Sequence, residues 1–436
     1  MREVAPNPGD TTGDVHPDRW RMLALLALAE LLGMSLWFAG NAVAPQLRSL
    51  WNLSGAQVGW LTTAVQLGFV AGTGVVAILN LADIIPSRTL FSVAAVLGAA
   101  ANLALLAADG FFIAVVTRFA CGFCLAGVYP PAMKMIATWF RARRGLAVGT
   151  IVGALTVGKA TPYLVPAFPT AGVDAIVISG SVSAAMAAAL VWLGYREGPY
   201  PFPPRPFSWS LVSTVARSPQ WRLATGGYLG HMFELYSYWT WIPAFLAASA
   251  ARHAGSATLL PVEERLTYLL AFGTIAIGGF GCLWGGLVAD RLGRERLVII
   301  AMAISGVCAL LIGATFGRGW LLVAPIALAW GFFVIADSAQ FSVLITESVP
   351  PHAVGTALML QTSIGFLLTT VSIQLVPPLV RAAGWAWAFP LLAMGPIAGI
   401  AAIRRLLTLK ARMRAHTINA DSAAPSAASS IPSITT

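Results

Sequence analysis

The sequence alternates long apolar stretches with short polar connections, and this alternation limits the folds that the chain can adopt. About twelve stretches reach the roughly 20 mainly apolar residues that a helix needs to cross a bilayer. They begin near residues 22, 57, 88, 111, 144, 173, 222, 266, 296, 321, 354 and 385. Only 10% of the residues are charged, against about 25% in soluble proteins. The sequence therefore predicts an all-α polytopic membrane protein with twelve transmembrane helices.

Lysine and arginine residues are distributed unevenly between the two ends of the predicted helices. Of the 27, 19 fall on the side of the N-terminus, 5 on the opposite side and 3 inside helices. Because cytoplasmic loops of membrane proteins are enriched in positive charge, both termini are predicted to be cytoplasmic. This bias explains the net charge of +10 without nucleic-acid binding. The first apolar stretch is full length and follows a polar segment, so we expect it to remain in a bacterial-type plasma (inner) membrane.

One connection is longer than the others and divides the predicted helices into two sets of six. It runs from Arg196 to Ser210 and is rich in proline. The end of the chain has a low-complexity composition that is typical of disorder. The predicted organisation is a cytoplasmic N-terminal tail at 1–21, a six-helix bundle at 22–195, a cytoplasmic linker at 196–221, a second six-helix bundle at 222–407 and a disordered cytoplasmic tail at 408–436.

The polar loop at residues 285–296, GGLVADRLGRER, has an earlier counterpart at residues 79–89, LNLADIIPSRT. Aligning Asp83 with Asp290 gives an offset of 207, which lays the first six predicted helices over the last six. Two six-helix halves in one chain form the parallel repeat found in one large class of secondary transporters, whose substrate site lies between the halves. We therefore expect two pseudo-symmetric bundles with a site at their interface.

The segment from Gly286 to Arg294 resembles a loop signature of the major facilitator superfamily, which runs Gly, any, Leu or similar, Ala, Asp, Arg, any, Gly, Arg. The match is complete apart from a valine at the aliphatic position. Two further signatures of the family fall on the fourth helix and, in part, on the fifth. They comprise Arg118, Phe119, Gly122, Gly127 and Pro130, and then Gly149, Gly153, Gly158 and Pro162. The resemblance implies a transporter with alternating access, in which helices 1, 4, 7 and 10 line the central path.

The resemblance also implies that the loop latches the cytoplasmic side closed. Gly286 lets a neighbouring helix pack closely, and Asp290 can accept hydrogen bonds from the first amides of a helix in the other half. Arg291 and Arg294 can pair with acids at helix ends, with Glu347 as the candidate partner. An alternative is that these charges only enforce topology. The predicted cytoplasmic gate consists of Asp83, Gly286, Asp290, Arg291, Gly293, Arg294 and Glu347.

Six ionisable residues fall inside predicted helices and away from the helix ends, where a charge costs at least a few kcal/mol and marks a functional candidate. They are Glu30, Arg118, Lys159, His231, Glu234 and Asp337. Polar and aromatic residues line the same or neighbouring helix faces. These are Trp37 and Asn41 with Glu30, Gln66 on the second helix, Tyr129 with Arg118, and Tyr238 with Glu234. Together these residues are predicted to line a substrate and proton path between the halves.

The predicted roles follow from the chemistry of these side chains. Carboxyl groups within the membrane mark proton relays, so Glu30 and Glu234 are the predicted proton carriers, with His231 beside Glu234. Arg118 and Lys159 can hold an anionic substrate, since arginine can bind a carboxylate through two hydrogen bonds. An alternative is that these acids and bases pair across helices and hold the bundle together.

The predicted function is secondary active transport of a small organic, anionic solute by proton-coupled symport. Three alternatives stay open: a proton-antiport exporter of drugs or metabolites, a pore for nitrate-like ions, and a non-transporting membrane sensor. No catalytic constellation and no GxxxxGK[ST] motif occurs, so neither an enzyme nor an ATP-driven pump is expected. No cofactor or metal site is predicted, and Cys121 and Cys124 are interpreted as small packing residues. The expected partners are a small-molecule substrate, protons and the lipid bilayer, with no nucleic acid and a monomeric state.

Overall fold

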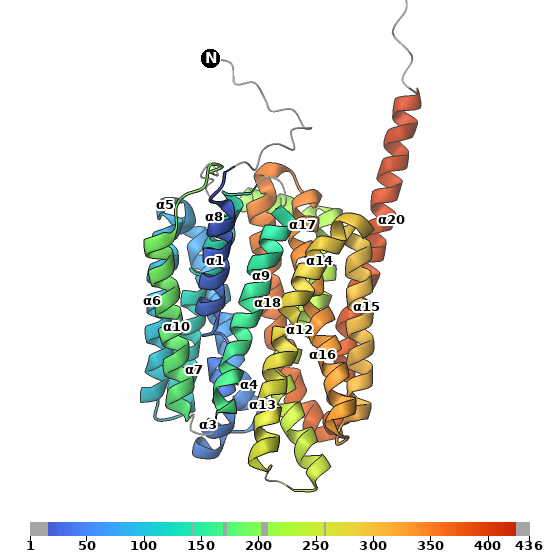
Figure 1. Cartoon of the computed structure of the whole chain (residues 1–436). Helices are drawn as coiled ribbons and strands as arrows, with labels where there is room; N and C mark the ends of the chain where they lie inside the picture. Colours follow the sequence, from blue (N-terminus) through green and yellow to red (C-terminus); the bar gives the residue numbers. More distant parts are fainter. Residues whose placement is uncertain (1–15, 141–143, 169–171, 202–207, 257–258, 424–436) are drawn as a thin grey trace, which may run out of the picture.

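The computed structural model describes residues 16–140, 144–168, 172–201, 208–256 and 259–423, and this part of the chain forms helices and no strand. Figure 1 shows two bundles side by side, the first in blue to green and the second in yellow to red. The first described helix begins, and the last described helix ends, at the same end of the molecule, at the top of Figure 1. We call this the terminal end, and the other the far end.

Most helices of both bundles run along the long axis of the molecule. The first bundle contains α1 (Arg19–Met34), α2 (Ala39–Ala42), α3 (Ala44–Trp51), α4 (Gly55–Ile78), α5 (Leu81–Ile84), α6 (Ser87–Leu103), α7 (Phe111–Leu125), α8 (Tyr129–Ala137), α9 (Arg144–Leu164) and α10 (Val173–Gly194). After α11 (Trp209–Arg217), the second bundle contains α12 (Pro219–Ala254), α13 (Pro261–Ala276), α14 (Gly278–Leu292), α15 (Arg294–Ile312), α16 (Trp320–Ala336), α17 (Ser338–Ser348), α18 (Val354–Ala383), α19 (Trp385–Ala388) and α20 (Met394–Ala423).

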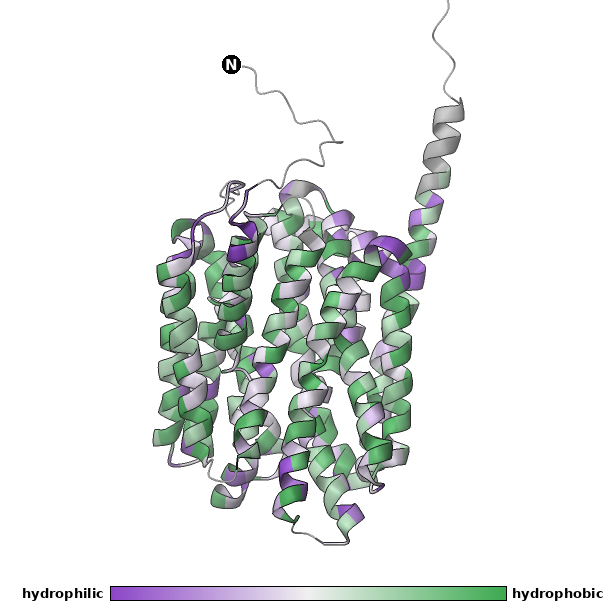
Figure 2. Cartoon of the chain, viewed as in Figure 1, coloured by the Kyte–Doolittle hydropathy of each residue, from purple (hydrophilic) through white to green (hydrophobic). Residues whose placement is uncertain are grey.

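The helices match the membrane spans expected from the sequence. In the described part of the chain, ten helical segments are long and apolar enough to cross a membrane. The other two spans are interrupted by shape or by polarity. Residues 19–51 are broken between α1 and α2, and the 36-residue helix α12 carries His231 and Glu234 in its middle. Figure 2 shows apolar residues over the sides of both bundles and hydrophilic residues gathered at the ends. The structure thus confirms the all-α polytopic membrane fold, in which helices satisfy their own backbone hydrogen bonds within lipid.

Two helices are broken at positions that the internal repeat relates to each other. The fourth span divides into α7 and α8 at residues 126–128, and the tenth divides into α16 and α17 at Asp337. Discontinuous helices at corresponding positions of two halves are a structural sign of a transport site. Asp337 also places an ionisable side chain directly at the break.

Glycines bring the two bundles together along α9 and α14. A Cβ atom on Gly153 would lie 2.9 Å from the carbonyl oxygen of Gly279, which is too close for any side chain. Nearer the terminal end, a Cβ atom on Gly286 would lie 3.4 Å from the carbonyl oxygen of Gly145. Small residues of this kind let helix backbones approach in a membrane.

The predicted linker at 196–221 is partly helical and partly bound to the first bundle. It contains α11, and α12 begins within it at Pro219. The indole Nε1 of Trp139 donates to the carbonyl of Arg196 at 3.1 Å, and the amide of Gly198 donates to Oγ1 of Thr138 at 3.2 Å. The start of the linker is therefore anchored at the terminal end of α8.

The tail predicted to be disordered from residue 408 is helical as far as Ala423, so that part of the prediction is wrong. In Figure 1, α20 extends past the bundle at the terminal end. The segment LKARMRA at 409–415 consists of strong helix formers, and Nζ of Lys410 lies 2.6 Å from Oε1 of Glu295 on α15. Residues 424–436 lie outside the described part of the chain.

Candidate functional site

A cavity lies between the two bundles and is lined by both. Residues of α1, α8 and α9 line one side, and residues of α12, α16, α17 and α18 line the other. The cavity is narrow and leaves about 70 Å³ for the centres of water-sized molecules. On α9 the lining residues are Val148, Val152, Leu155 and Lys159, which share one helix face. Since α9 begins at the terminal end, the cavity extends from there deep into the molecule.

Lys159 presents an ammonium group to this cavity inside a cage of aromatic rings. Its side chain is buried, and Nζ donates a hydrogen bond to Oη of Tyr236 at 2.7 Å. Nζ also lies 4.1 Å from the ring centroid of Trp37, 4.9 Å from that of Tyr236 and 5.1 Å from that of Trp239. Aromatic faces at such distances attract a cation. Because Trp37 belongs to the first bundle and the other two rings to the second, the cage spans the interface.

The far side of the cavity is closed by contacts between α4 and α18. The ring centroid of Phe366 lies 4.7 Å from that of Phe69 and 5.6 Å from that of Trp37. Farther along, Nε2 of Gln374 donates to Oγ1 of Thr63 at 3.1 Å. These contacts join the two bundles and separate the cavity from the far end.

Glu30 lies beside the cavity without forming part of its wall. Its side chain is fully buried, and neither carboxylate oxygen has a hydrogen-bond partner among the described residues. The carbonyl oxygen of Leu31 packs directly against Gly158, so α1 and α9 touch at this level. Glu30 consequently interacts electrostatically with Lys159, although the two groups do not form a direct ion pair.

Arg118 is placed differently from the sequence-based prediction. It was expected to hold an anionic substrate, but it is fully buried and lies outside the cavity wall. Nη1 donates to Oδ1 of Asn102 at 2.8 Å, and Nη2 donates to the carbonyls of Leu36 and Trp37 at 2.6 and 2.9 Å. Those carbonyls lie at the break between α1 and α2, where regular helical hydrogen bonding is interrupted and the carbonyl of Leu36 accepts only a long bond of 3.4 Å from the amide of Ala39. Arg118 therefore caps a broken helix.

The ionisable residues of the second bundle form their own buried cluster. Oε1 and Oε2 of Glu234 accept hydrogen bonds from Nε1 of Trp330 at 2.8 Å and from Oγ of Ser305 at 2.9 Å. Nδ1 of His231 lies 2.9 Å from Oδ1 of Asp337, and both side chains are buried. His231 thus pairs with Asp337 at the helix break, rather than with Glu234 as the sequence suggested.

The cavity-facing side of α12 is not the face chosen from the sequence. The predicted stripe contains His231, Glu234 and Tyr238, yet none of them lines the cavity. Oη of Tyr238 donates to the carbonyl of Ala327 at 2.8 Å, inside the second bundle. The cavity instead meets the adjacent face, which consists of Tyr228, Met232, Leu235, Tyr236 and Trp239. These residues repeat at helical spacing, and that pattern was the available sequence signal.

The remaining path residues divide between the cavity and the packing of the first bundle. Trp37 and Tyr129 line the cavity. Oδ1 of Asn41 accepts a hydrogen bond from Oγ1 of Thr62 at 2.5 Å. Gln66 is buried on α4 and does not line the cavity. The structure therefore brings together Trp37, Tyr129 and Lys159 from the predicted set.

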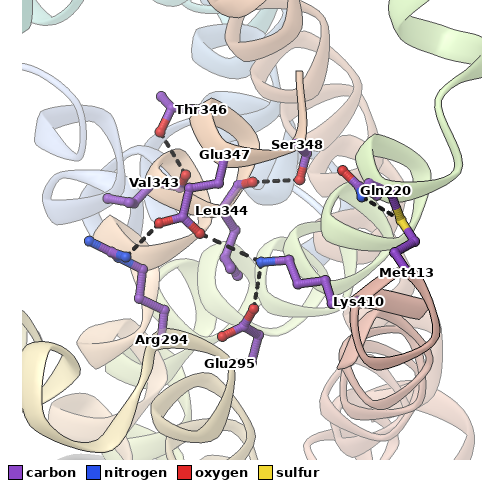
Figure 3. Close-up of polar contacts among 10 residues, drawn as sticks. All are labelled: Gln220, Arg294, Glu295, Val343, Leu344, Thr346, Glu347, Ser348, Lys410 and Met413. Atoms are coloured by element: carbon purple, nitrogen blue, oxygen red, sulfur yellow. Dashed lines mark hydrogen bonds and ion pairs between the residues drawn. The ribbon is translucent and has the colours of Figure 1, made fainter. Parts of the chain in front are cut away.

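The predicted pair of Arg294 and Glu347 is present, within a network at the terminal end (Figure 3). Nη1 of Arg294 lies 2.5 Å from Oε1 of Glu347. Nζ of Lys410 lies 3.5 Å from Oε2 of Glu347 and 2.6 Å from Oε1 of Glu295. All four residues belong to the second bundle, on α15, α17 and α20. The network therefore joins three helices of the second bundle to one another.

Among the residues that the structure describes, an ion pair of another predicted gate residue also lies within one bundle. Asp83 pairs with Lys134 of the first bundle at 2.7 Å. Asp290 and Arg291 are exposed, and neither is in an ion pair with a described residue. Gly293 takes a φ of +86° between α14 and α15, a conformation that favours glycine. Among the described residues, the gate makes its contact between bundles through the packing of Gly286 and not through ion pairs.

Glu347→Gln is therefore expected to have a small effect. The side chains of Arg294 and Glu347 are 36% and 39% exposed, and pairs of this kind contribute about 1 kcal/mol or less. We expect the free energy of unfolding to fall by no more than that, with solute flux through reconstituted protein retained. Chemical denaturation and vesicle flux measure the two quantities. Loss of flux without loss of stability would instead support the interpretation that this loop holds the cytoplasmic side closed.

No group of three His, Cys, Asp or Glu side chains suited to a metal ion occurs among the described residues. The four cysteines are free thiols. Cys121 and Cys124 lie on α7, where Cys121 is buried.

Comparison with known proteins agrees with this architecture. Residues 25–373 match the family model described as Major Facilitator Superfamily. An uncharacterised MFS-type transporter of Mycobacterium tuberculosis (strain ATCC 25618 / H37Rv) is 25% identical over 324 residues, which cover 73% of this chain and 70% of the relative. The shikimate transporter of Escherichia coli (strain K12) is 24% identical over 195 residues, covering 41% of this chain and 43% of that protein.

A solved structure shares the fold at low identity. It is the crystal structure of a bacterial homologue of the human lysosomal transporter Spinster, in an inward-facing and unoccupied conformation. It matches with a TM-score of 0.66 and 16% identity, covering 90% of this chain and 95% of that chain.

Proposed function

Because the chain belongs to the Major Facilitator Superfamily, we propose that it is a secondary active transporter of a small organic anion, driven by proton symport. The observation that carries the proposal is the position of Lys159. This residue presents a cation at the deep end of a cavity between two pseudo-symmetric bundles. Transporters with two parallel halves bind substrate at that interface and expose it alternately to each side.

The contacts between the bundles support alternating access. Near the terminal end the bundles meet through glycine packing, and near the far end through aromatic rings and one hydrogen bond between Gln374 and Thr63. Such contacts can separate at modest cost when two rigid bundles rock. The distribution of positive charge favours the terminal end as the cytoplasmic side of a bacterial-type inner membrane. In this proposed orientation the cavity extends toward the cytoplasmic side along α9, and the transporter is proposed to act as a monomer.

Proton coupling is supported by the buried carboxyl groups. Glu30 and Glu234 are both enclosed within their bundles, and intramembrane acids of this kind mark proton relays. Glu30 lies next to the cavity, whereas Glu234 is hydrogen-bonded inside the second bundle.

The test is flux in sealed vesicles that contain the purified full-length chain. Shikimate is the first probe, because it is a ring-bearing monocarboxylate named for one relative, and a panel of other monocarboxylates follows. We expect at least one of these anions to accumulate when the outside is acidic, together with proton entry reported by a trapped pH-sensitive dye. Binding without flux for every anion would favour a sensor over a transporter.

An exporter that exchanges protons for lipophilic cations is the second candidate. The aromatic residues along the cavity wall favour it, since aromatic faces attract a cationic ligand. In the same vesicles, benzyltrimethylammonium would then drive proton movement in the opposite direction, and carboxylates would not.

A further inference from the structure

Glu30 is a buried acid whose surroundings offer one compensating charge. Its oxygens accept no hydrogen bond from a described residue, and an isolated buried carboxylate is costly. Lys159, on the helix packed against it, is the basic group with which Glu30 interacts electrostatically. The charge of Glu30 is therefore tied to that of Lys159.

Lys159 in turn forms no direct ion pair with a carboxylate of the described residues. Its partners are the hydroxyl of Tyr236 and three aromatic rings, which leave its charge without a close counterion. Among the described residues that line the cavity, it is also the single charged side chain. An anion that enters the cavity meets one cation, several aromatic rings and the polar side chains of Ser338, Ser342 and Gln361.

We propose that Glu30 and Lys159 form a charge pair that links the binding of one proton at Glu30 to the binding of one monoanionic, flat-bodied carboxylate at Lys159. When Glu30 is ionised, it offsets the charge of Lys159 and weakens the attraction for an anion. When a proton from the cavity binds a carboxylate oxygen of Glu30, the charge of Lys159 becomes available to the substrate. Proton and substrate then favour each other reciprocally, as thermodynamic linkage requires.

Two consequences define the transported species. A loaded site holds one added proton and one added negative charge, so the loaded carrier has the same net charge as the empty one. Transport is therefore electroneutral, with one proton per monoanion. A dianion would leave one charge uncompensated in a buried cavity, which is costly. The inference rests on the proposed function and specifies its substrate charge and coupling.

Other ionisable groups near Glu30 are engaged elsewhere or lie at a distance. Tyr129 on α8 faces both Glu30 and the cavity. Lys134, also on α8, is paired with Asp83. Asp174 lies in the first turn of α10, which is at the far end of the molecule. Across the cavity, His231 is paired with Asp337.

The test is calorimetric titration of the purified full-length protein with benzoate, in two buffers of different ionisation enthalpy. The wild-type protein is expected to take up about one proton per benzoate as the pH is raised through the titration of Glu30. Over the same range the affinity for benzoate is expected to fall about 10- to 100-fold. Phthalate, a dianion, and benzamide, a neutral analogue, are expected to bind at least about tenfold more weakly.

Glu30→Gln is the decisive variant, because it mimics the protonated acid. It is expected to bind benzoate with the tight, low-pH affinity of the wild-type protein at every pH, without proton uptake. Glu264→Gln, the same change at an exposed position of α13, is the control and should keep the wild-type pH dependence. Melting temperatures establish that both variants are folded.

Several results would overturn the linkage. They are absence of proton uptake by the wild-type protein, pH dependence that survives in Glu30→Gln, and pH dependence that disappears in Glu234→Gln instead. In vesicles, uptake driven by a potassium diffusion potential without a pH gradient would also contradict electroneutral transport. Carboxylate flux with any of these results would leave the proposed transport standing. Proton-linked benzoate binding without carboxylate flux would refute transport and leave the linkage standing.

Discussion

Arg118→Ala is expected to lower the free energy of unfolding by about 3 to 5 kcal/mol, the cost of removing one partner from a buried charged network. The guanidinium donates to Asn102 and to the carbonyls of Leu36 and Trp37, at 2.6 to 2.9 Å. Without it, the carbonyl of Trp37 loses this donor, and the carbonyl of Leu36 keeps only the 3.4 Å bond from the amide of Ala39. The turn that carries Trp37 into the aromatic cage would lose its support.

Denaturant unfolding of the purified protein measures this effect, and the indole fluorescence of the cage gives a second signal. Arg118→Lys should recover part of the stability, because an ammonium can reach one or two of the three acceptors. Arg405→Ala, an exposed position on α20, is the matched control and should change stability by less than about 0.5 kcal/mol. A stability loss for Arg118→Ala no larger than that of the control would refute the capping role.

Lys159→Met is expected to reduce anion flux by at least about 100-fold, because the substrate loses its buried partner charge. Stability should be retained or should rise, since an apolar side chain of similar length fills the aromatic cage and removes a costly buried charge. This contrast separates a binding residue from a structural one. Arg118 and Lys159 are both buried cations of the first bundle. Replacing Arg118 is expected to lower stability, whereas replacing Lys159 is expected to lower transport.

Vesicle flux and thermal unfolding of the same preparation test this prediction. Lys410→Met is the control: it removes an ammonium group from the terminal-end network, where its side chain is 21% exposed, and should leave most of the flux. If Lys159→Met kept wild-type flux, the cation at the cavity would not be needed. The anion proposal would then give way to the exporter of lipophilic cations.

Local patterns were sufficient for the membrane spans, because a lipid environment demands long apolar helices that satisfy their own backbone. The predicted starts near residues 57, 88, 111, 144, 173 and 354 lie within two residues of the observed helix starts at Gly55, Ser87, Phe111, Arg144, Val173 and Val354. The pairing of Arg294 with Glu347 was also predictable, since both residues lie at helix ends on the same side of the membrane.

Local sequence patterns were not sufficient to predict which face of each helix lines the cavity. On α12 two neighbouring stripes have helical spacing, one with His231 and Glu234 and the other with Tyr228 and Trp239. In a membrane bundle a polar stripe can face either the cavity or the interior of its own bundle, because both locations supply hydrogen bonds. Trp330 and Ser305 supply them to Glu234 from within the bundle. The sequence alone does not show which helices will pack around Glu234.

The sequence by itself determined the membrane fold, the division into two halves, the family, and the short list of buried charges. Each of these depends on hydrophobicity, repetition or residue type, which are properties of single segments. Only the tertiary structure decided that Arg118 caps a helix break, that His231 pairs with Asp337, and that Lys159 stands in the cavity beside Glu30. A buried charge is stabilised by whatever packs around it, and those neighbours come from distant parts of the chain.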